Sequence, residues 1–555
     1  MKMNIKNLLL QGMSIGSVAV CFFGLTSCRT SDTENSNNLT EGTKAQVNIN
    51  FMGTAFKDGG LDPQASLKSS GLSGNSGKEQ SHSVMITPST VMVTTLSPLK
   101  IGALAQAGLR NTMASVTGTP LNNGTKFRII AYKASDGSYQ TYQDYTIGET
   151  SQPITLNTGV AYNIVAYSYG TSSLPTITPG ETSNISSAQI TYDNNNRDLM
   201  YVKQSYTPSS TNTNVNLTLI HQLTQITTSI TTNIDDIKDI QNAVLTPHFS
   251  NGSFPLSTGV MAGRTANAPQ SIDFTANSFP VTLNSPANAS SVLINANTTG
   301  NAASFSADIA IGAAPLKTLT VTNAFDITPG MQANLNIGVF RCGAWMDAAH
   351  TQWRPFLCQN LGATPGTDPF ALVKENHGAK YQWGYKPANP NVSDNRYLTS
   401  TDDQLYTGTP PAGWTNTTLA DDSWNANPGG GANNPCPTGY RVPTTAEWNA
   451  VLNYNTIERT TSSWANSSTN FASALYIKDP VSNKRTLMLP SAGNRYNLNG
   501  TLSHRGDTGI YWTSTWGFNS GTPIADDLEF DTTRAVVFRW YTRAMGFSVR
   551  CIAEH

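Results

Sequence analysis

Charged side chains are scarce in this sequence. Asp, Glu, Lys and Arg make up 12% of its 555 residues, and 34 basic against 35 acidic side chains give a formal net charge of −1. A chain without a basic surface has little to hold a polyanion, which argues against nucleic acid as a partner. Long apolar runs are also rare: one occurs, at the extreme N-terminus, and the mean hydropathy is −0.29. The length allows roughly three or four domains.

Tryptophan and cysteine are missing from most of the chain. All ten Trp residues follow residue 340, and so do the four cysteines that remain once Cys21 and Cys28 of the N-terminal segment are set aside. This shift in composition predicts two kinds of domain that join near Phe340. Ser, Thr, Asn and Gly take the place of charge, which is typical of turns and exposed strand faces in secreted β-proteins.

The N-terminus has the pattern of an export signal. Lys2 and Lys6 precede an apolar run from Leu8 to Leu25. The run ends in Leu-Thr-Ser-Cys28, which resembles a bacterial lipobox. The resemblance implies a signal peptide over 1–27, a lipidated Cys28 and a polar tether over 28–45. A triacylated Cys28 would anchor the chain stably in the outer membrane.

Two alternatives to the lipoprotein interpretation are a plain signal peptide and a retained signal anchor. Asp32 and Glu34 of the tether resemble the acidic signal that directs Bacteroidetes lipoproteins to the cell surface. A solvated linker is the alternative for these two residues.

Between the tether and residue 340 the sequence predicts strand after strand. Residues 331–339 alternate apolar and polar side chains, the period of a half-buried strand. Asp136-Gly137 predicts a hairpin turn after a strand over 127–131. The apolar phase of 215–219 shifts by 226–230, which indicates a bulge or a change of sheet near His221.

Four segments carry a resemblance to the fimbrillin family of Bacteroidetes surface proteins: Phe-Arg-Ile-Ile-Ala-Tyr at 127–132, Asn-Thr-Gly-Val-Ala-Tyr-Asn-Ile at 157–164, Leu-Ile-His-Gln-Leu at 219–223 and Ile-Thr-Pro-Gly at 327–330. The resemblance implies two tandem Greek-key β-sandwiches, over 46–180 and 181–339.

In that family, the resemblance further implies, an Arg-specific protease removes an N-terminal strand and a strand of another fimbrial subunit fills the groove by β-strand addition. Arg110, followed by Asn111, is the one arginine between Arg29 and Arg128 and hence the candidate cleavage site. An ordinary solvated arginine is the alternative. Because 331–339 runs directly into a further domain, we expect the chain to accept a strand but not to donate one, which favours the tip of a fimbria.

After residue 340 the sequence becomes aromatic and rich in loops. Thr444 and Glu447 have the spacing of a capping box, which predicts a short helix. The segments 356–363, 381–384 and 436–448 resemble the Fibrobacter succinogenes major paralogous (FISUMP) domain, which is itself similar to the C-type-lectin-like fold of formylglycine-generating enzymes. The resemblance implies an α+β domain over 340–555.

The four cysteines of this domain allow three pairings. The resemblance puts Cys436 and Cys551 at the structural disulfide of the fold, and an oxidising periplasm favours a second bridge between Cys342 and Cys358. A zinc site of Cys342, His350 and Cys358 is the alternative, although it lacks a Cys-x-x-Cys pair. We find no activated cysteine of the kind that the enzymes of this fold use.

Two groups of residues are candidates for ligand binding. Alternate acidic side chains could bind calcium, or could form a solvated acidic edge: Asp526, Asp527, Glu529 and Asp531. Exposed Trp383, Trp414 and Trp424 could stack on sugars, although core packing explains tryptophans equally well.

The sequence thus predicts a mostly β protein with two tandem fimbrillin-like sandwiches and a C-type-lectin-like domain. Its predicted function is that of a cell-surface lipoprotein and fimbrial accessory or tip adhesin, whose C-terminal domain contacts a glycan or a host or matrix protein. A solitary carbohydrate-binding lipoprotein of the outer membrane is the second hypothesis. An enzyme is the weakest, since no His-Glu-x-x-His motif occurs and the Gly-x-Ser-x-Gly pattern occurs only at 12–16, within the predicted signal peptide.

Overall fold

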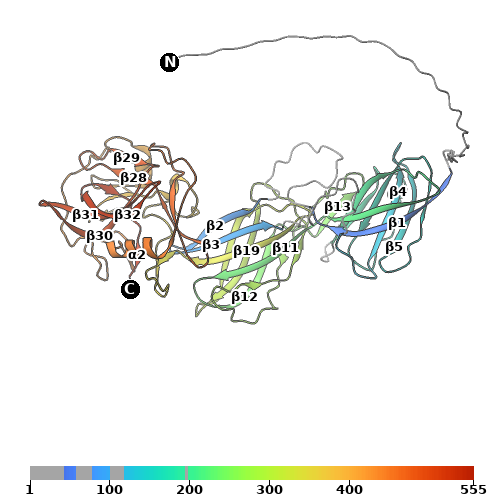
Figure 1. Ribbon diagram of the computed structural model, residues 1–555, viewed down its shortest axis with the longest axis horizontal. Coiled ribbons are helices and arrows are strands. Elements are labelled where there is room, and N and C mark those ends of the chain that lie inside the picture. The colour runs from blue at the N-terminus through green and yellow to red at the C-terminus, as the bar shows by residue number, and fades with distance from the viewer. Residues whose placement is uncertain (1–42, 58–77, 100–117, 194–197, 555) are drawn as a thin grey trace, which may run out of the picture.

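The computed structural model describes residues 43–57, 78–99, 118–193 and 198–554. The lipidation site Cys28, the signal peptide and the Arg110-Asn111 bond lie outside the described residues. Strands dominate the fold, and three groups of sheets follow one another along the long axis of the molecule (Figure 1). No helix in these ranges is long and apolar enough to cross a membrane.

The first group is a seven-stranded sheet in the order β5-β4-β7-β9-β10-β1-β6. Its strands are Lys44–Ala55 (β1), Lys126–Lys133 (β4), Tyr139–Thr146 (β5), Ile154–Asn157 (β6), Tyr162–Ser168 (β7), Met200–Tyr206 (β9) and Asn212–His221 (β10). The hairpin expected at Asp136-Gly137 is confirmed, since β4 and β5 pair antiparallel around it. One face of the sheet encloses an apolar core to which β1, β4, β6, β7 and β10 all contribute.

The second group is a β-sandwich of a six-stranded and a four-stranded sheet with one continuous core between them. The larger sheet contains Gln80–Thr87 (β2), Thr90–Pro98 (β3), Thr224–Thr232 (β11), Ala287–Asn288 (β15), Val292–Ile294 (β16) and Gln332–Arg341 (β19). The smaller contains Ile237–Thr246 (β12), Gln270–Ser271 (β14), Ala303–Ile311 (β17) and Lys317–Phe325 (β18). A further pair, Gln189–Asp193 (β8) and Asn251–Pro255 (β13), lies between the two groups and packs its apolar side chains with the other face of the seven-stranded sheet.

The strands do not follow the expected division at residues 180 and 181. β9 and β10, over 200–221, pair in the first sheet, whereas β2 and β3, over 80–98, pair with β19 in the second. The expected change of sheet near His221 is confirmed, because β10 and β11 belong to different sheets. Backbone pairing between segments far apart in the sequence therefore sets these boundaries.

The C-terminal domain begins one residue after β19. Its strands form five small sheets. They are Gly343–Trp345 (β20), Trp353–Pro355 (β21), Lys380–Gln382 (β22), Tyr397–Leu398 (β23), Tyr440–Arg441 (β24), Thr456–Arg459 (β25), Ala474–Lys478 (β26), Arg485–Pro490 (β27), Ala492–Arg495 (β28), Leu502–Arg505 (β29), Gly509–Asn519 (β30), Thr522–Phe530 (β31), Ala535–Thr542 (β32), Gly546–Phe547 (β33) and Ile552–Ala553 (β34). The helical elements are Lys374–Asn376 (η1), Ser400–Leu405 (α1) and Thr445–Tyr454 (α2).

The predicted capping box is confirmed at the start of α2. Thr444 Oγ1 accepts a hydrogen bond from the backbone N–H of Glu447, and the Glu447 carboxylate accepts one from the N–H of Thr444. Arg441 binds the same carboxylate through two hydrogen bonds. Trp448 and Val451 of this helix are buried in the core beneath β30 and β31.

The β2–β3 hairpin joins the sandwich to the C-terminal domain. At its tip, Ser89 accepts a hydrogen bond from the N–H of Cys342, and Pro88 accepts one from that of Cys358. Val91 of β3 is buried in one apolar cluster with Phe356 and Trp448. The two domains therefore share a core at this junction.

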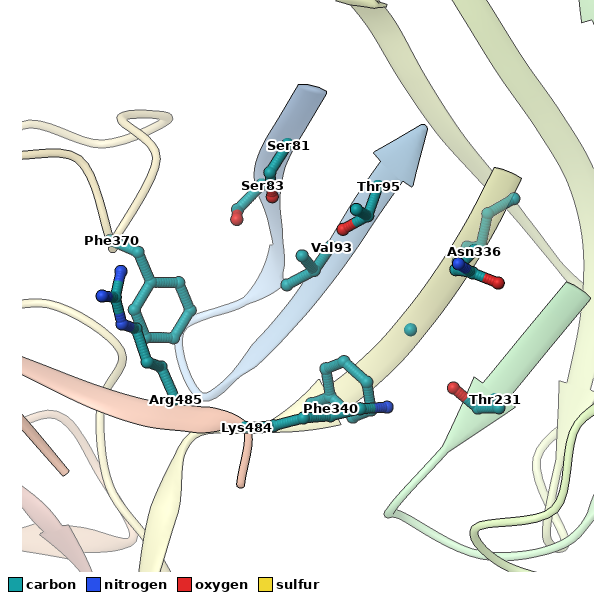
Figure 2. A pocket seen from close by; sticks show the side chains of 12 residues that line it. Ser81, Ser83, Val93, Thr95, Thr231, Asn336, Phe340, Phe370, Lys484 and Arg485 are labelled. Carbon is teal, nitrogen blue, oxygen red and sulfur yellow. The ribbon is translucent and has the colours of Figure 1, made fainter. Parts of the chain in front are cut away.

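A cavity of about 270 Å³ lies beside the junction (Figure 2). The sandwich lines it with small polar side chains such as Ser83 and Thr95, and the C-terminal domain lines it with Phe370 and Lys484. Lys484 Nζ lies 4.3 Å from the centre of the Phe340 ring. Phe340 thus contacts both sides of the junction.

Candidate functional site

The first candidate site is β1 and its place in the first sheet. β1 pairs parallel with β10 along most of its length and antiparallel with β6 at its first four residues. It is the first strand of the described chain and is paired on both sides. If β1 left, a groove with unpaired backbone groups on β10 would remain, which is the geometry that β-strand addition requires.

β1 also fills part of the core. Ala45, Val47 and Ile49 alternate with exposed polar residues and are buried, and the Phe51 ring stacks on Phe127 with 5.0 Å between ring centres. Burial of one Val or Ile side chain stabilises a fold by about 1.5–3 kcal/mol. A strand that replaces β1 must therefore present apolar side chains at the same alternate positions.

The order of the strands changes what cleavage at Arg110 would do. The family resemblance implies one N-terminal strand before Arg110, whereas the structure has β1, β2 and β3 before it. β2 and β3 were missed because their Ser- and Thr-rich faces are only partly buried and dilute the apolar alternation. A cut after Arg110 would break the covalent link between these three strands and the rest of the chain. Two of them, β2 and β3, belong to the six-stranded sheet of the sandwich.

Both favoured disulfides are present. Cys342 is bonded to Cys358 and Cys436 to Cys551. The zinc alternative is therefore wrong, because its two cysteines are bonded to each other, and His350 Nε2 instead lies 3.2 Å from the carbonyl oxygen of Tyr454. With all four cysteines paired, none of them is a free thiol nucleophile.

The three tryptophans expected to be exposed are buried. Trp383 and Trp424 are 0% exposed and Trp414 is 8% exposed. Each indole N–H donates to a backbone carbonyl, of Thr513, Asn433 and Ala544 respectively. The prediction that these rings stack on sugars is wrong, because the loop-rich part of the domain has little secondary structure and uses large indoles to fill its core.

The four acidic residues do not form a calcium ligand set. Asp526 faces α2, where it binds Arg539 and accepts a hydrogen bond from Thr445 Oγ1, whereas Glu529 and Asp531 both bind Arg534. Within the described ranges, no group of three or more His, Cys, Asp or Glu side chains is placed to hold a metal ion. The solvated-edge alternative is also wrong for the three residues of β31, since Asp526, Asp527 and Glu529 are buried.

Asp527 is the exceptional member of this group. It is 0% exposed, and neither of its carboxyl oxygens has a hydrogen-bond partner among the residues that the structure describes. Burial, with the nearby charges of Glu529 and Asp526, raises the pKa of Asp527 to about 8. The carboxyl is therefore largely protonated at neutral pH.

A polar cleft of about 500 Å³ lies beside Glu529. It is lined by side chains from β29, β30, β31 and β32, from the turn between β31 and β32, and from two loops: Trp464, His504, Asp507, Thr508, Ile510, Glu529, Asp531, Thr532, Thr533, Arg534 and Tyr541. Glu529 and Asp531 are the two residues of the predicted ligand region that line it. Its volume falls in the usual range of small-molecule sites.

The exposed aromatic residues of the domain lie elsewhere. Trp516 and Phe518 of β30 are 37% and 55% exposed, and their rings meet edge to face at 5.9 Å. The β30–β31 hairpin that carries them lies at the end of the molecule remote from β1 (Figure 1). Sequence reasoning missed this pair, although the alternation of Trp516 and Phe518 before a Ser-Gly turn is the available signal.

Arg543 holds the base of this hairpin. Its guanidinium carbon lies 4.6 Å from the Trp383 ring centre and 5.1 Å from that of Trp516, so that the cation is placed between two indoles. Arg543 also donates hydrogen bonds to Asp421 and to the carbonyl oxygen of Ile524. These contacts fix the orientation of the Trp516 side chain.

These features define a modular, mostly β protein with the seven-stranded sheet that contains β1 at one end and a disulfide-bonded domain at the other. Residues 112–348 match the family model described as fimbrillin-like, and residues 357–553 match that of the Fibrobacter succinogenes major domain. Two successive parts of the chain are thus similar to two different families, the first fimbrillin-like and the second the Fibrobacter succinogenes major domain. No curated protein matches it.

Several solved structures are similar to part of the chain. A proposed cell adhesion protein from Bacteroides uniformis aligns with 12% identity and a TM-score of 0.27, over 40% of this chain and 92% of the other. A proposed cell adhesion protein from Parabacteroides distasonis aligns with 8% identity and a TM-score of 0.30, over 44% and 88%. A fimbrial assembly protein from the same species gives 8% identity and 0.27, over 42% and 86%.

Proposed function

We propose that this chain is a cell-surface lipoprotein that serves as an accessory or tip adhesin subunit of a fimbria, with its C-terminal domain contacting a ligand. The observation that carries the proposal is the position of β19. This strand is paired on both sides, with β11 and β3, and β20 follows it after one residue. The chain therefore has no free tail after its sandwich to donate to another subunit, and it ends a filament instead of extending it.

The place of β1 is the site where another subunit would add its strand. β1 is the first strand, and β10 and β6 both pair with it. A donor strand with apolar residues at alternate positions would regain the backbone hydrogen bonds and the buried side chains of Val47 and Ile49. Cleavage after Arg110, before Asn111, is the proposed processing event that cuts the covalent link between β1 and the rest of the chain, so that a donor strand can displace β1.

Anchoring through a lipidated Cys28 and location on the outer membrane belong to the same proposal. We expect Cys28→Ala to abolish incorporation of radiolabelled palmitate and to release the protein from the membrane fraction. Palmitate incorporation that persists in this variant would contradict the anchor.

Shearing of intact cells tests the filament role. We expect the chain in sheared, high-mass filaments, with labelled antibody at the filament ends. Labelling along the shaft would contradict the tip assignment, and retention of all the protein with the sheared cells would contradict a place in the filament.

The second candidate function is a solitary carbohydrate-binding lipoprotein of the outer membrane. The polar cleft beside Glu529 favours it, since a site of this size and polarity suits a hydrophilic small ligand. Neither candidate assigns the chain a catalytic role. Retention with the sheared cells together with binding to oligosaccharides would support this second function.

A further inference from the structure

The cleft beside Glu529 is a built site and not a loose surface depression. Glu529 forms part of its wall and is 6% exposed. The turn between β31 and β32 is held by Asp531, whose Oδ1 accepts hydrogen bonds from the N–H groups of Thr533 and Arg534 at 2.7 and 2.9 Å. Side chains that line the cleft from this turn are thus fixed before any ligand arrives.

Charges in the cleft are compensated within it. Arg534 pairs with both Glu529 and Asp531, and His504 Nδ1 lies 3.3 Å from Asp507. Tyr541 donates a hydrogen bond to the other oxygen of Glu529 at 3.2 Å. Because each carboxylate already has a cationic or hydroxyl partner, the cleft is poorly suited to a free ion of either sign.

The cleft therefore offers both hydrogen-bond acceptors and hydrogen-bond donors to an uncharged ligand. Each oxygen of Glu529 accepts one hydrogen bond and has a second lone pair, and Arg534 has five N–H groups with which to donate. The hydroxyl groups of Thr508 and Thr533 donate to Asp507 and Asp531, and their oxygens can accept. The indole of Trp464 adds an apolar wall, which is fixed by a hydrogen bond from its N–H to the carbonyl oxygen of Thr460. Adjacent hydroxyl groups on a sugar ring both donate and accept, and the C–H groups of its faces are apolar.

We propose that this cleft binds a sugar unit of a neutral oligosaccharide without a metal ion. The inference rests on the proposed function, because it names the ligand class that the C-terminal domain contacts. Glu529 and Arg534 hydrogen-bond the sugar hydroxyl groups, and Trp464 packs against its apolar face. The ion pair with Arg534 holds the Glu529 carboxylate in place to accept.

A protein partner would use a different surface. Trp516 and Phe518 project from a hairpin and are exposed, so they fit a pocket on another protein and do not enclose a small ligand. The concave cleft encloses its ligand, as sugar-sized sites do. Substitutions in the cleft should therefore weaken sugar binding, whereas Trp516→Ala should leave it unchanged.

The experiment uses the purified full-length chain and a panel of soluble probes. The neutral probes are mannotriose, cellotetraose, xylotetraose and N-acetyllactosamine, and calorimetry measures binding with and without EDTA. We expect at least one neutral probe to bind, with no change on adding EDTA. Glu529→Gln and Arg534→Ala should each weaken binding at least tenfold.

A matched control keeps the test specific. Glu458→Gln makes the same carboxylate-to-amide change in another ion pair of the domain, with Arg485, and should leave binding unchanged. Arg534 is half exposed, so its variant should fold even if the variant at buried Glu529 does not.

Three results would overturn the inference: binding of none of the neutral probes, binding that EDTA abolishes, or binding lost in Trp516→Ala but kept in both cleft variants. Any of these could occur while the chain is still recovered in sheared filaments. In that case this inference fails and the proposed fimbrial function stands.

Discussion

Cys342 donates its backbone N–H to the carbonyl oxygen of Ser89 over 2.9 Å, so that the C-terminal domain begins on the tip of a hairpin from the start of the chain. Cys342 also carries the shorter disulfide, to Cys358, whose N–H binds the adjacent Pro88. Because of these contacts, the stability of the C-terminal domain depends on residues 80–98, which precede it by more than 240 residues.

We therefore predict that Val91→Ala destabilises the C-terminal domain. Val91 is 1% exposed and packs in one cluster with Phe356 and Trp448, so its truncation should lower the free energy of unfolding by about 1–3 kcal/mol. All tryptophans lie after residue 340, so tryptophan fluorescence during urea unfolding reports this domain alone. Ser81→Ala, at an exposed position on the same hairpin, is the control. An unchanged fluorescence transition in Val91→Ala would refute the shared core.

We expect limited digestion with an Arg-specific protease to give a new N-terminus at Asn111. The N-terminal fragment contains β1, β2 and β3. It should co-elute with the rest of the chain in gel filtration, because its strands pair within both the seven-stranded and the six-stranded sheet. It should separate in denaturant. Arg110→Ala should resist this cut. A fragment that dissociates in native buffer would show that the pairing of these strands is weaker than the structure indicates.

The two disulfides should contribute unequally to stability. Chain entropy alone gives about 3 kcal/mol for the bridge between Cys342 and Cys358, which are 16 residues apart, and about 5 kcal/mol for that between Cys436 and Cys551, which are 115 apart. Replacing each pair by Ser and following urea unfolding by tryptophan fluorescence checks the order. A larger loss for the shorter loop would contradict it.

Asp527 should make stability depend on pH. In the unfolded chain this carboxyl ionises near its ordinary pKa of 3.8, whereas burial, Glu529 and Asp526 raise the pKa to about 8 in the fold. Between these values the folded state holds one more proton, so the contribution of Asp527 to the free energy of unfolding falls as the pH rises from about 4 to about 8. Asp527→Asn stays neutral, and its Tm relative to the wild type should therefore rise from pH 5 to pH 8.

A residue with the opposite pKa shift provides the control. The ion pair with Arg485 lowers the pKa of Glu458, so the wild-type side chain stabilises the fold above that pKa and loses this contribution as the pH falls through it. Glu458→Gln should therefore become less stable relative to the wild type as the pH rises through the acidic range. If the difference in Tm between Asp527→Asn and the wild type were independent of pH, Asp527 would be ionised in the fold throughout.

Local signals in the sequence predicted local structure well. The Thr444–Glu447 capping box, the Asp136-Gly137 hairpin and the alternation before Val339 each involve residues within a few positions of one another, and each is confirmed. Both disulfides were also anticipated, although that expectation depended on a family resemblance and on the redox compartment.

Long-range pairing and burial were not predictable in the same way. Nothing near residues 80–98 reveals that they pair with β19, because the partner lies far along the chain. The composition of an aromatic, loop-rich segment likewise does not distinguish buried Trp383 from exposed Trp516. The calcium site predicted at the acidic residues around Asp527 was wrong, because the arginines that pair with Asp526 and Glu529 come from β32 and its preceding turn, which the acidic pattern does not reveal.

The orientation of β1 determines how the molecule would bear tension. β1 runs roughly along the long axis, and the C-terminal domain lies at the opposite end of the molecule (Figure 1). A pull between an anchored N-terminus and a bound C-terminal domain would act along the strand, so the hydrogen bonds to β10 would be loaded together in shear and would not open one at a time. If the protein holds an attached cell under flow, the pulling force would thus act along β1. This is the direction in which a pair of strands resists separation most.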